Sequence, residues 1–170
     1  MKRRIAGFAL VLPVLAVILS ACGSKAATPP PTSTATTSHV TPVPTPLIAY
    51  GSYTDPILRT SIGEAQQTLA KFRKPDYETL GDQCSLAGGD ISNQQTSFHG
   101  AIAPNTTARM VFRTAENGYK LVLSSMDECG MAADSRSKGQ LTTAGNDLKA
   151  GLYYLARAEY STGHWQSGRT

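Results

Sequence analysis

The stretch LTTAGNDLKAGLYYLARAE, residues 141–159, carries the clearest helical pattern in this chain. Its apolar side chains recur every three or four positions, which places them on one face of an α-helix: Leu141, Ala144, Leu148, Leu152 and Leu155. Glu159 is the next position on that face, and we expect its carboxylate to reach solvent near the helix end. The pattern therefore predicts a helix that buries one face in a core.

An earlier segment, residues 55–74, repeats this periodicity. Asp55 followed by Pro56 predicts its start, because aspartate is a favoured N-cap and proline suits the first helical position. Pro75 predicts its end, since the residue before a proline avoids the helical conformation. The apolar face between these limits consists of Leu58, Ile62, Ala65, Leu69 and Phe72.

The next segment has a longer apolar face, formed by Tyr77, Leu80, Cys84, Ala87, Ile91, Gln94 and Phe98. The pair Gly88-Gly89 interrupts the pattern, and each glycine costs ~1 kcal/mol relative to alanine inside a helix. We therefore expect a helix with a kink or a break at this pair. Pro104 and Asn105 close the segment.

Residues 106–134 allow two interpretations. As a helix, the segment presents a face of mostly small side chains: Val111, Ala115, Gly118, Val122, Ser125, Cys129 and Ala132. As a hairpin over residues 109–125, it would turn at Asn117-Gly118, a dipeptide typical of type I′ turns. We favour the helix, because three neighbouring helices need a fourth to cover them and an isolated hairpin is marginally stable. The predicted fold is all-α, a small four-helix bundle, and the alternative is an α+β fold with a hairpin at 109-125.

The first 21 residues have the organisation of a secretory signal peptide, with basic residues 2–4 before an uncharged, mostly apolar run. That run ends in Leu19-Ser20-Ala21-Cys22, which resembles the lipobox of bacterial lipoproteins. The resemblance implies that cleavage leaves Cys22 as a first residue carrying a diacylglycerol. Two or three acyl chains hold a protein firmly at a bilayer, so we expect an anchor on the extracytoplasmic face of the cell membrane without a membrane span.

Residues 22–54 differ in composition from the rest of the chain. Thr, Pro, Ser and Ala dominate them, and no charged residue stands between Lys25 and Asp55. Such a sequence buries too little apolar surface to offset chain entropy, and its prolines favour extended conformations. We therefore predict a disordered linker over 22–54, one helical domain over 55–160, and a frayed tail over 161–170.

The chain has three cysteines, and lipidation of Cys22 would leave the pair Cys84 and Cys129. Two thiols in an exported protein are expected to form a disulfide, which here would close a loop of 45 residues and add ~4 kcal/mol of stability in the chain-entropy model. If the two helices meet in a turn centred near residue 105, Cys84 lies opposite position 126. Cys129 is then ~4.5 Å further along the axis, so a tilt or kink must bring the cysteines together.

The charge balance argues against nucleic acid as a partner. The formal net charge is +4, but loss of residues 1–21 would remove three basic residues and leave 13 basic against 12 acidic side chains. No basic stripe with interleaved aromatic residues remains. The partners that we expect are the membrane, through the N-terminal lipid, and a protein or cell-wall component.

No sequence motif identifies a catalytic or metal site. The polar residues that could meet in one pocket are Asp82, Asp90, His99 and Glu128. The soft ligands that could hold copper(I) are Met126, Cys129, Met131 and His99. The sequence contains no H-E-x-x-H, C-x-x-C or paired E-x-x-H motif, so we predict no catalytic residue, no cofactor and no resident metal.

These observations favour a membrane-anchored, non-enzymatic binding module. Two alternatives stay open at this stage. The first is an enzyme or enzyme accessory of the cell envelope, which would need a deep polar pocket. The second is a soft-metal carrier, which would need the methionine, cysteine and histidine side chains to converge.

Overall fold

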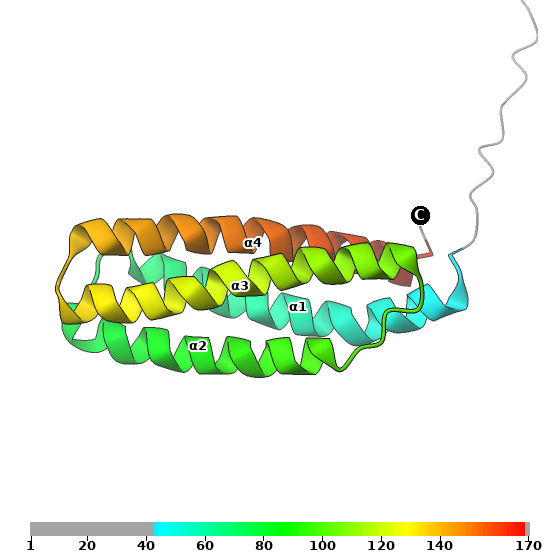
Figure 1. Cartoon of the computed structure of the whole chain (residues 1–170), viewed down its shortest axis with the longest axis horizontal. Helices are drawn as coiled ribbons and strands as arrows, with labels where there is room; N and C mark the ends of the chain where they lie inside the picture. Colours follow the sequence, from blue (N-terminus) through cyan, green and yellow to red (C-terminus); the bar gives the residue numbers. More distant parts are fainter. Residues whose placement is uncertain (1–42, 169–170) are drawn as a thin grey trace, which may run out of the picture. The chain divides into compact units, whose positions relative to one another are not determined.

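The computed structural model of the protein describes residues 43–168. Within that range the chain forms four helices and no strand: α1 (Thr45–Lys71), α2 (Tyr77–His99), α3 (Thr106–Asp134) and α4 (Lys138–Gln166). The helices lie side by side along their length, and this arrangement confirms the all-α four-helix bundle (Figure 1). The alternative hairpin at 109-125 is wrong, because that segment is continuous helix inside α3. The expected signal peptide, Cys22 and the linker up to residue 42 lie outside the described residues.

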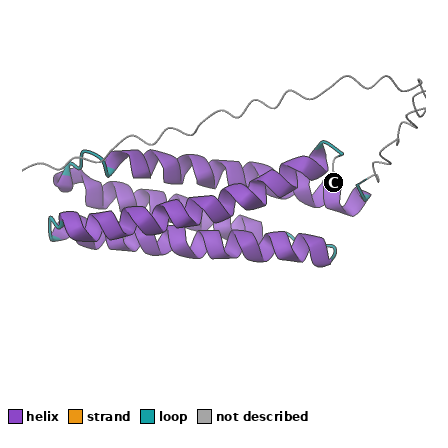
Figure 2. Cartoon of the chain, turned by 90° about the horizontal axis from the view of Figure 1, so that it is seen from above, coloured by secondary structure: helices purple, strands orange, loops and turns teal. Residues whose placement is uncertain are grey.

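Each helix runs antiparallel to the one before it, and α4 returns along α1 to close the ring (Figures 1 and 2). The closest pair is α3 and α4, where two glycines face one another. A Cβ added at Gly151 would lie 2.6 Å from Cγ2 of Val122, and one added at Gly118 would lie 2.8 Å from Cγ of Leu155. The two backbones therefore approach as closely as they do because neither position has a side chain.

The domain begins ten residues earlier than the sequence predicted. Helix α1 starts at Thr45, not at Asp55, and the prolines at positions 44 and 46 occupy its N-cap and first turn. Both positions tolerate proline, since the first N–H groups of a helix have no intrahelical partner. Leu47, Tyr50 and Thr54 are buried and extend the apolar face of the helix towards its N-terminus. The proline- and threonine-rich composition hid this continuation, so the predicted linker boundary at residue 54 was wrong.

The predicted tail from residue 161 was also wrong, because α4 continues to Gln166. Trp165 is 6% exposed, and its ring lies 6.2 Å from that of Tyr50 between centroids. The side-chain amide of Gln166 donates a hydrogen bond of 3.0 Å to the carbonyl of Gly51. The early turns of α1 and the last turns of α4 thus cover each other, which explains why neither extension was recognisable by itself.

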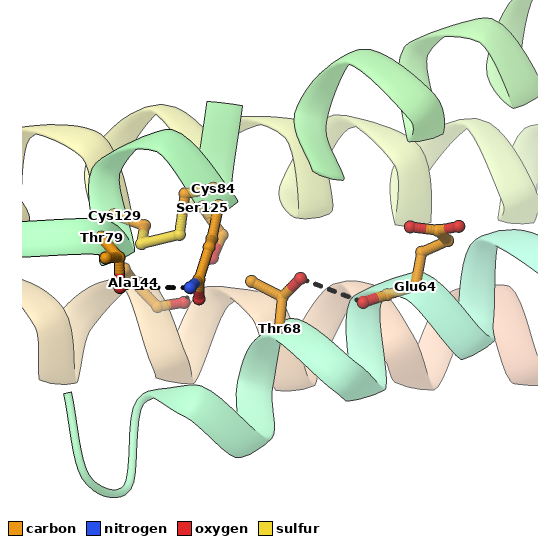
Figure 3. Close-up of a disulfide and its surroundings, with 8 residues drawn as sticks. Glu64, Thr68, Thr79, Cys84, Ser125, Cys129 and Ala144 are labelled. Atoms are coloured by element: carbon orange, nitrogen blue, oxygen red, sulfur yellow. Dashed lines mark hydrogen bonds between the residues drawn. A yellow bond between two sulfur atoms is a disulfide. The ribbon is translucent and has the colours of Figure 1, made fainter. Parts of the chain in front are cut away.

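Helices α2 and α3 are joined at the predicted cysteine pair (Figure 3). Cys84 and Cys129 form a disulfide with their Cα atoms 6.1 Å apart, and both side chains are fully buried. One turn earlier on α3, the hydroxyl of Ser125 donates a hydrogen bond of 2.7 Å to the carbonyl of Ala144 on α4. The disulfide and this hydrogen bond tie α3 to both of its neighbours.

The expected kink at Gly88-Gly89 is absent, and the predicted register of α2 and α3 was wrong. Helix α2 is continuous, and the missing side chain of Gly88 leaves room for Met126, whose Cβ would lie 3.3 Å from an added Cβ. His99, the last residue of α2, lies beside Glu116, which is ten positions into α3. The connection over residues 100–105 therefore runs along the first turns of α3 (Figure 1), and this change of register brings Cys84 level with Cys129.

Candidate functional site

The soft-metal ligands do not converge. Cys129 is bonded to Cys84, so it has no thiolate to offer. Met126 is buried, whereas Met131 is 58% exposed. His99 lies beside Glu116 with 3.6 Å between Nε2 and Oε1, and that glutamate is ~15 Å along α3 from Met126. Within residues 43–168, no group of three or more His, Cys, Asp or Glu side chains is placed to hold a metal ion.

The carboxylates proposed for an enzyme are also dispersed. Asp82 and Asp90 are exposed on α2, and Glu128 lines a small separate hollow with Met131. Asp127 and Asp134 line an open groove of about 580 Å³ between α2 and α3, where most of the α2 side is glycine and serine. These two carboxylates are seven positions apart, which is ~10 Å along the helix. The groove therefore does not assemble a pair of acid and base groups.

An ionic cluster with a buried aspartate and an exposed arginine joins α1 to α4. The Nε atom of Arg59 lies 2.9 Å from Oδ2 of Asp55 and 3.0 Å from Oε1 of Glu159. The hydroxyl of Thr162 donates a hydrogen bond of 3.3 Å to Oδ1 of Asp55. Asp55 is therefore buried in mid-helix and not an N-cap, and Glu159 is paired with an arginine across the interface. The polar groups of the cluster bind one another, so we assign the cluster to the packing of α1 against α4.

A second feature lies at the end of the bundle opposite Thr45. There the end of α1, the start of α2 and the first half of α4 surround a cleft of about 520 Å³, which we call the tip cleft. Its apolar lining consists of Leu69, Phe72, Pro75, Tyr77 and Leu141. A Cβ added at Gly145 would lie 3.4 Å from Cδ2 of Phe72, so that ring sits directly on the backbone of α4.

The charged side chains that line the tip cleft are all cationic: Arg73, Lys138 and Lys149. In the part of the chain that the structure describes, none of the three forms an ion pair. The two carboxylates closest in sequence to Arg73 are engaged elsewhere. Asp76 accepts hydrogen bonds from the backbone N–H of Glu78 and the hydroxyl of Thr79, and Glu78 lies 3.7 Å from Arg136. The cleft therefore combines an apolar surface with an unbalanced positive charge.

Sequence reasoning missed the tip cleft because its lining comes from two segments, residues 69–77 and 138–149, that are far apart in the chain. One pattern in the sequence does point to this cleft. Lys138, Thr142, Gly145 and Lys149 follow helical spacing on one face of α4, beside the apolar stripe. Such a basic edge resembles an ordinary solvated face until α1 and α2 are packed against it.

Comparisons with known proteins give no relative to this chain: no family model, no curated protein and no solved structure matches it. The site is therefore defined by its own geometry and charge. No helix in residues 43–168 is long and apolar enough to cross a membrane.

Proposed function

We propose that this chain is a lipid-anchored extracytoplasmic protein that presents a four-helix bundle as a binding module. The observation that carries the proposal is the sequence Leu19-Ser20-Ala21-Cys22 at the end of a basic and then apolar N-terminal segment. Attachment of at least two acyl chains to Cys22 holds the protein at the bilayer without a membrane-spanning helix.

Two features of the bundle support this proposal. A buried disulfide is typical of proteins that leave the reducing cytoplasm. The chain enters the bundle at the start of α1, while the tip cleft lies at the far end of that helix. Helix α1 has 27 residues and so is ~40 Å long, which separates the attachment point from the cleft.

No contact among residues 43–168 favours an enzyme or a copper carrier over a binding module. The acidic residues are dispersed, and the copper ligands are divided between the disulfide, the core and the far end of α2. Binding requires only a cleft of suitable shape and charge, and the tip cleft supplies one.

The proposal is tested by expressing the full chain in a bacterium with radiolabelled palmitate. We expect the label and the protein to appear together in the membrane fraction. Cys22→Ser should abolish labelling and leave an unprocessed or soluble protein. The double variant Cys84→Ala/Cys129→Ala is the matched control, since it removes cysteines without touching the motif, and it should still be labelled. Equal labelling of the wild type and Cys22→Ser would contradict the proposal.

A further inference from the structure

Among the cavities of residues 43–168, the tip cleft combines an apolar lining with three cations and no carboxylate. A hollow of about 430 Å³ has a single cation, Lys120. The larger groove between α2 and α3 is lined mainly by small side chains with two aspartates. The hollow near Glu128 is about 240 Å³ and has one carboxylate. The cleft over Ala101 and Phe112 has two arginines together with Glu116.

We infer that the tip cleft binds a small soluble molecule in which a carboxylate, sulfonate or phosphate group is attached to an aromatic or apolar body. This inference rests on the proposed function, for which it names the class of ligand. The volume of about 520 Å³ falls within the range of clefts that hold small molecules.

The aromatic side chains of the cleft match the apolar body of the ligand, and its cations match the anionic group. The ring of Phe72 is half-buried against α4, and the side chain of Tyr77 approaches from α2, so the site offers aromatic surface to a flat apolar group. Lys138 and Lys149 lie on α4 at either end of the cleft, about three turns apart. Arg73 comes from the end of α1, so cations flank the apolar surface from two helices.

The charge of the cleft selects against cations and favours anions. Three positive side chains without a carboxylate in the cleft lining repel metal ions and basic peptides. They attract a negatively charged group over a distance that shortens as the ionic strength rises. The first backbone N–H groups of α4 lie at Lys138 and carry partial positive charge of the same sign. A neutral apolar molecule would meet the aromatic surface but would gain nothing from these groups.

The test uses two fluorescent probes that share an aromatic body. Anilinonaphthalene sulfonate carries a negative charge, and phenylnaphthylamine lacks the sulfonate. For the full chain purified with its disulfide intact, we expect the anionic probe to bind at one site and to bind more tightly than the neutral one. The affinity for the anionic probe should fall as salt is raised.

Two pairs of variants locate the site. Lys138→Gln/Lys149→Gln should weaken binding of the anionic probe by about twofold to thirtyfold, because two exposed charges that together contribute ~0.4–2 kcal/mol are lost, and should leave the neutral probe unchanged. Lys120→Gln/Arg157→Gln removes the same net charge outside the cleft and should have no effect.

Thr142→Trp fills the cleft from an exposed position, so it should block both probes. Thr143→Trp, on the next position of the same helix and outside the cleft, should block neither. Both tryptophan variants should keep the wild-type circular dichroism spectrum and melting temperature.

Three results would overturn the inference. They are equal affinity for the two probes, unchanged binding in both cleft variants, or binding of the bundle to anionic phospholipid vesicles that requires Lys138 and Lys149. The last result would identify the surface as a membrane-docking face. Because these experiments need no lipid on Cys22, failure of probe binding leaves the anchoring proposal standing. Failure of palmitate labelling likewise leaves the cleft inference standing.

Discussion

Single glycines determine how closely α3 and α4 approach. Gly118 and Gly151 stand where an added Cβ would meet another helix at 2.8 Å and 2.6 Å. The neighbours at Gly151 include the backbone N of Val122 and the carbonyl of Gly118, both 2.9 Å away, which cannot move without shifting a helix. Here backbone atoms form the contact. Glycine is required because no side chain fits between the helices, and not because the backbone has a positive φ.

Gly151→Ala should lower the free energy of unfolding by ~1–3 kcal/mol, because the new methyl group forces α3 away from α4. The matched control is Gly89→Ala in α2, where nothing lies within 4 Å of an added Cβ. That change should raise the stability by up to ~1 kcal/mol through helix propensity. Urea denaturation followed by circular dichroism measures both. A neutral Gly151→Ala would show that the helices are further apart than described.

Burial raises the pKa of the Tyr50 and Tyr119 phenols from 10.0 to about 12, although a hydrogen bond to Ser61 partly offsets this for Tyr119. The unfolded chain loses these protons near pH 10, whereas the folded chain keeps them until near pH 12. The free energy of unfolding should therefore be unaffected by these groups below about pH 9 and should fall between pH 10 and pH 12, by ~1–3 kcal/mol for each tyrosine.

Replacing a buried phenol should make this fall less steep. We expect Tyr50→Phe to flatten the decline in urea denaturation measured from pH 9 to pH 11. Tyr153→Phe changes a 63% exposed phenol and should leave the decline as it is in the wild type. A decline that is identical in all three proteins would show that Tyr50 is accessible to solvent.

At the scale of the elements, most of the bundle was predictable because the apolar residues on each core face recur every three or four positions. Leu58, Ala65, Leu148 and Leu155 were placed on core faces from periodicity alone, and all four are fully buried. The errors arose at the ends, where the pattern depends on a distant partner. Leu47 and Trp165 are core residues only because α1 and α4 extend along each other. The register of α2 against α3 depended on the path of residues 100–105, which periodicity does not specify.

The extension of α1 is testable with the single tryptophan of the chain. A protein that starts at residue 55 should lose the cover that residues 43–54 provide over Trp165. We expect its fluorescence emission to shift to longer wavelength and its melting temperature to fall. A protein that starts at residue 43 is the control and should show buried tryptophan emission. The same emission from both proteins would support the original boundary at residue 54.

At the scale of the whole molecule, the bundle has a core with many small side chains and one covalent link. Alanine and glycine occupy many interhelical positions, as in α3 with Ala108, Ala115, Gly118 and Ala132. Small side chains bury little apolar area each, so the disulfide carries a larger share of the stability than it would in a leucine-rich core.

Loss of the disulfide should therefore destabilise the bundle strongly. Cys84→Ala/Cys129→Ala should lower the free energy of unfolding by ~2–5 kcal/mol while the helical circular dichroism spectrum is retained. Treatment of the wild-type protein with a reductant should have a similar effect, and the same treatment should leave the double variant unchanged. Equal stability with and without reductant in the wild type would mean that the cysteines are not bonded in solution.

We propose that the chain is anchored by a lipid on Cys22 and folded around a disulfide between α2 and α3. Mass spectrometry of the protein purified from its membrane fraction, with peptide mapping before and after reduction, tests both parts at once. We expect an N-terminal peptide that begins with a diacylated Cys22, and a cross-linked peptide pair containing Cys84 and Cys129 that separates on reduction. An unmodified N-terminal segment together with free thiols at positions 84 and 129 would contradict it.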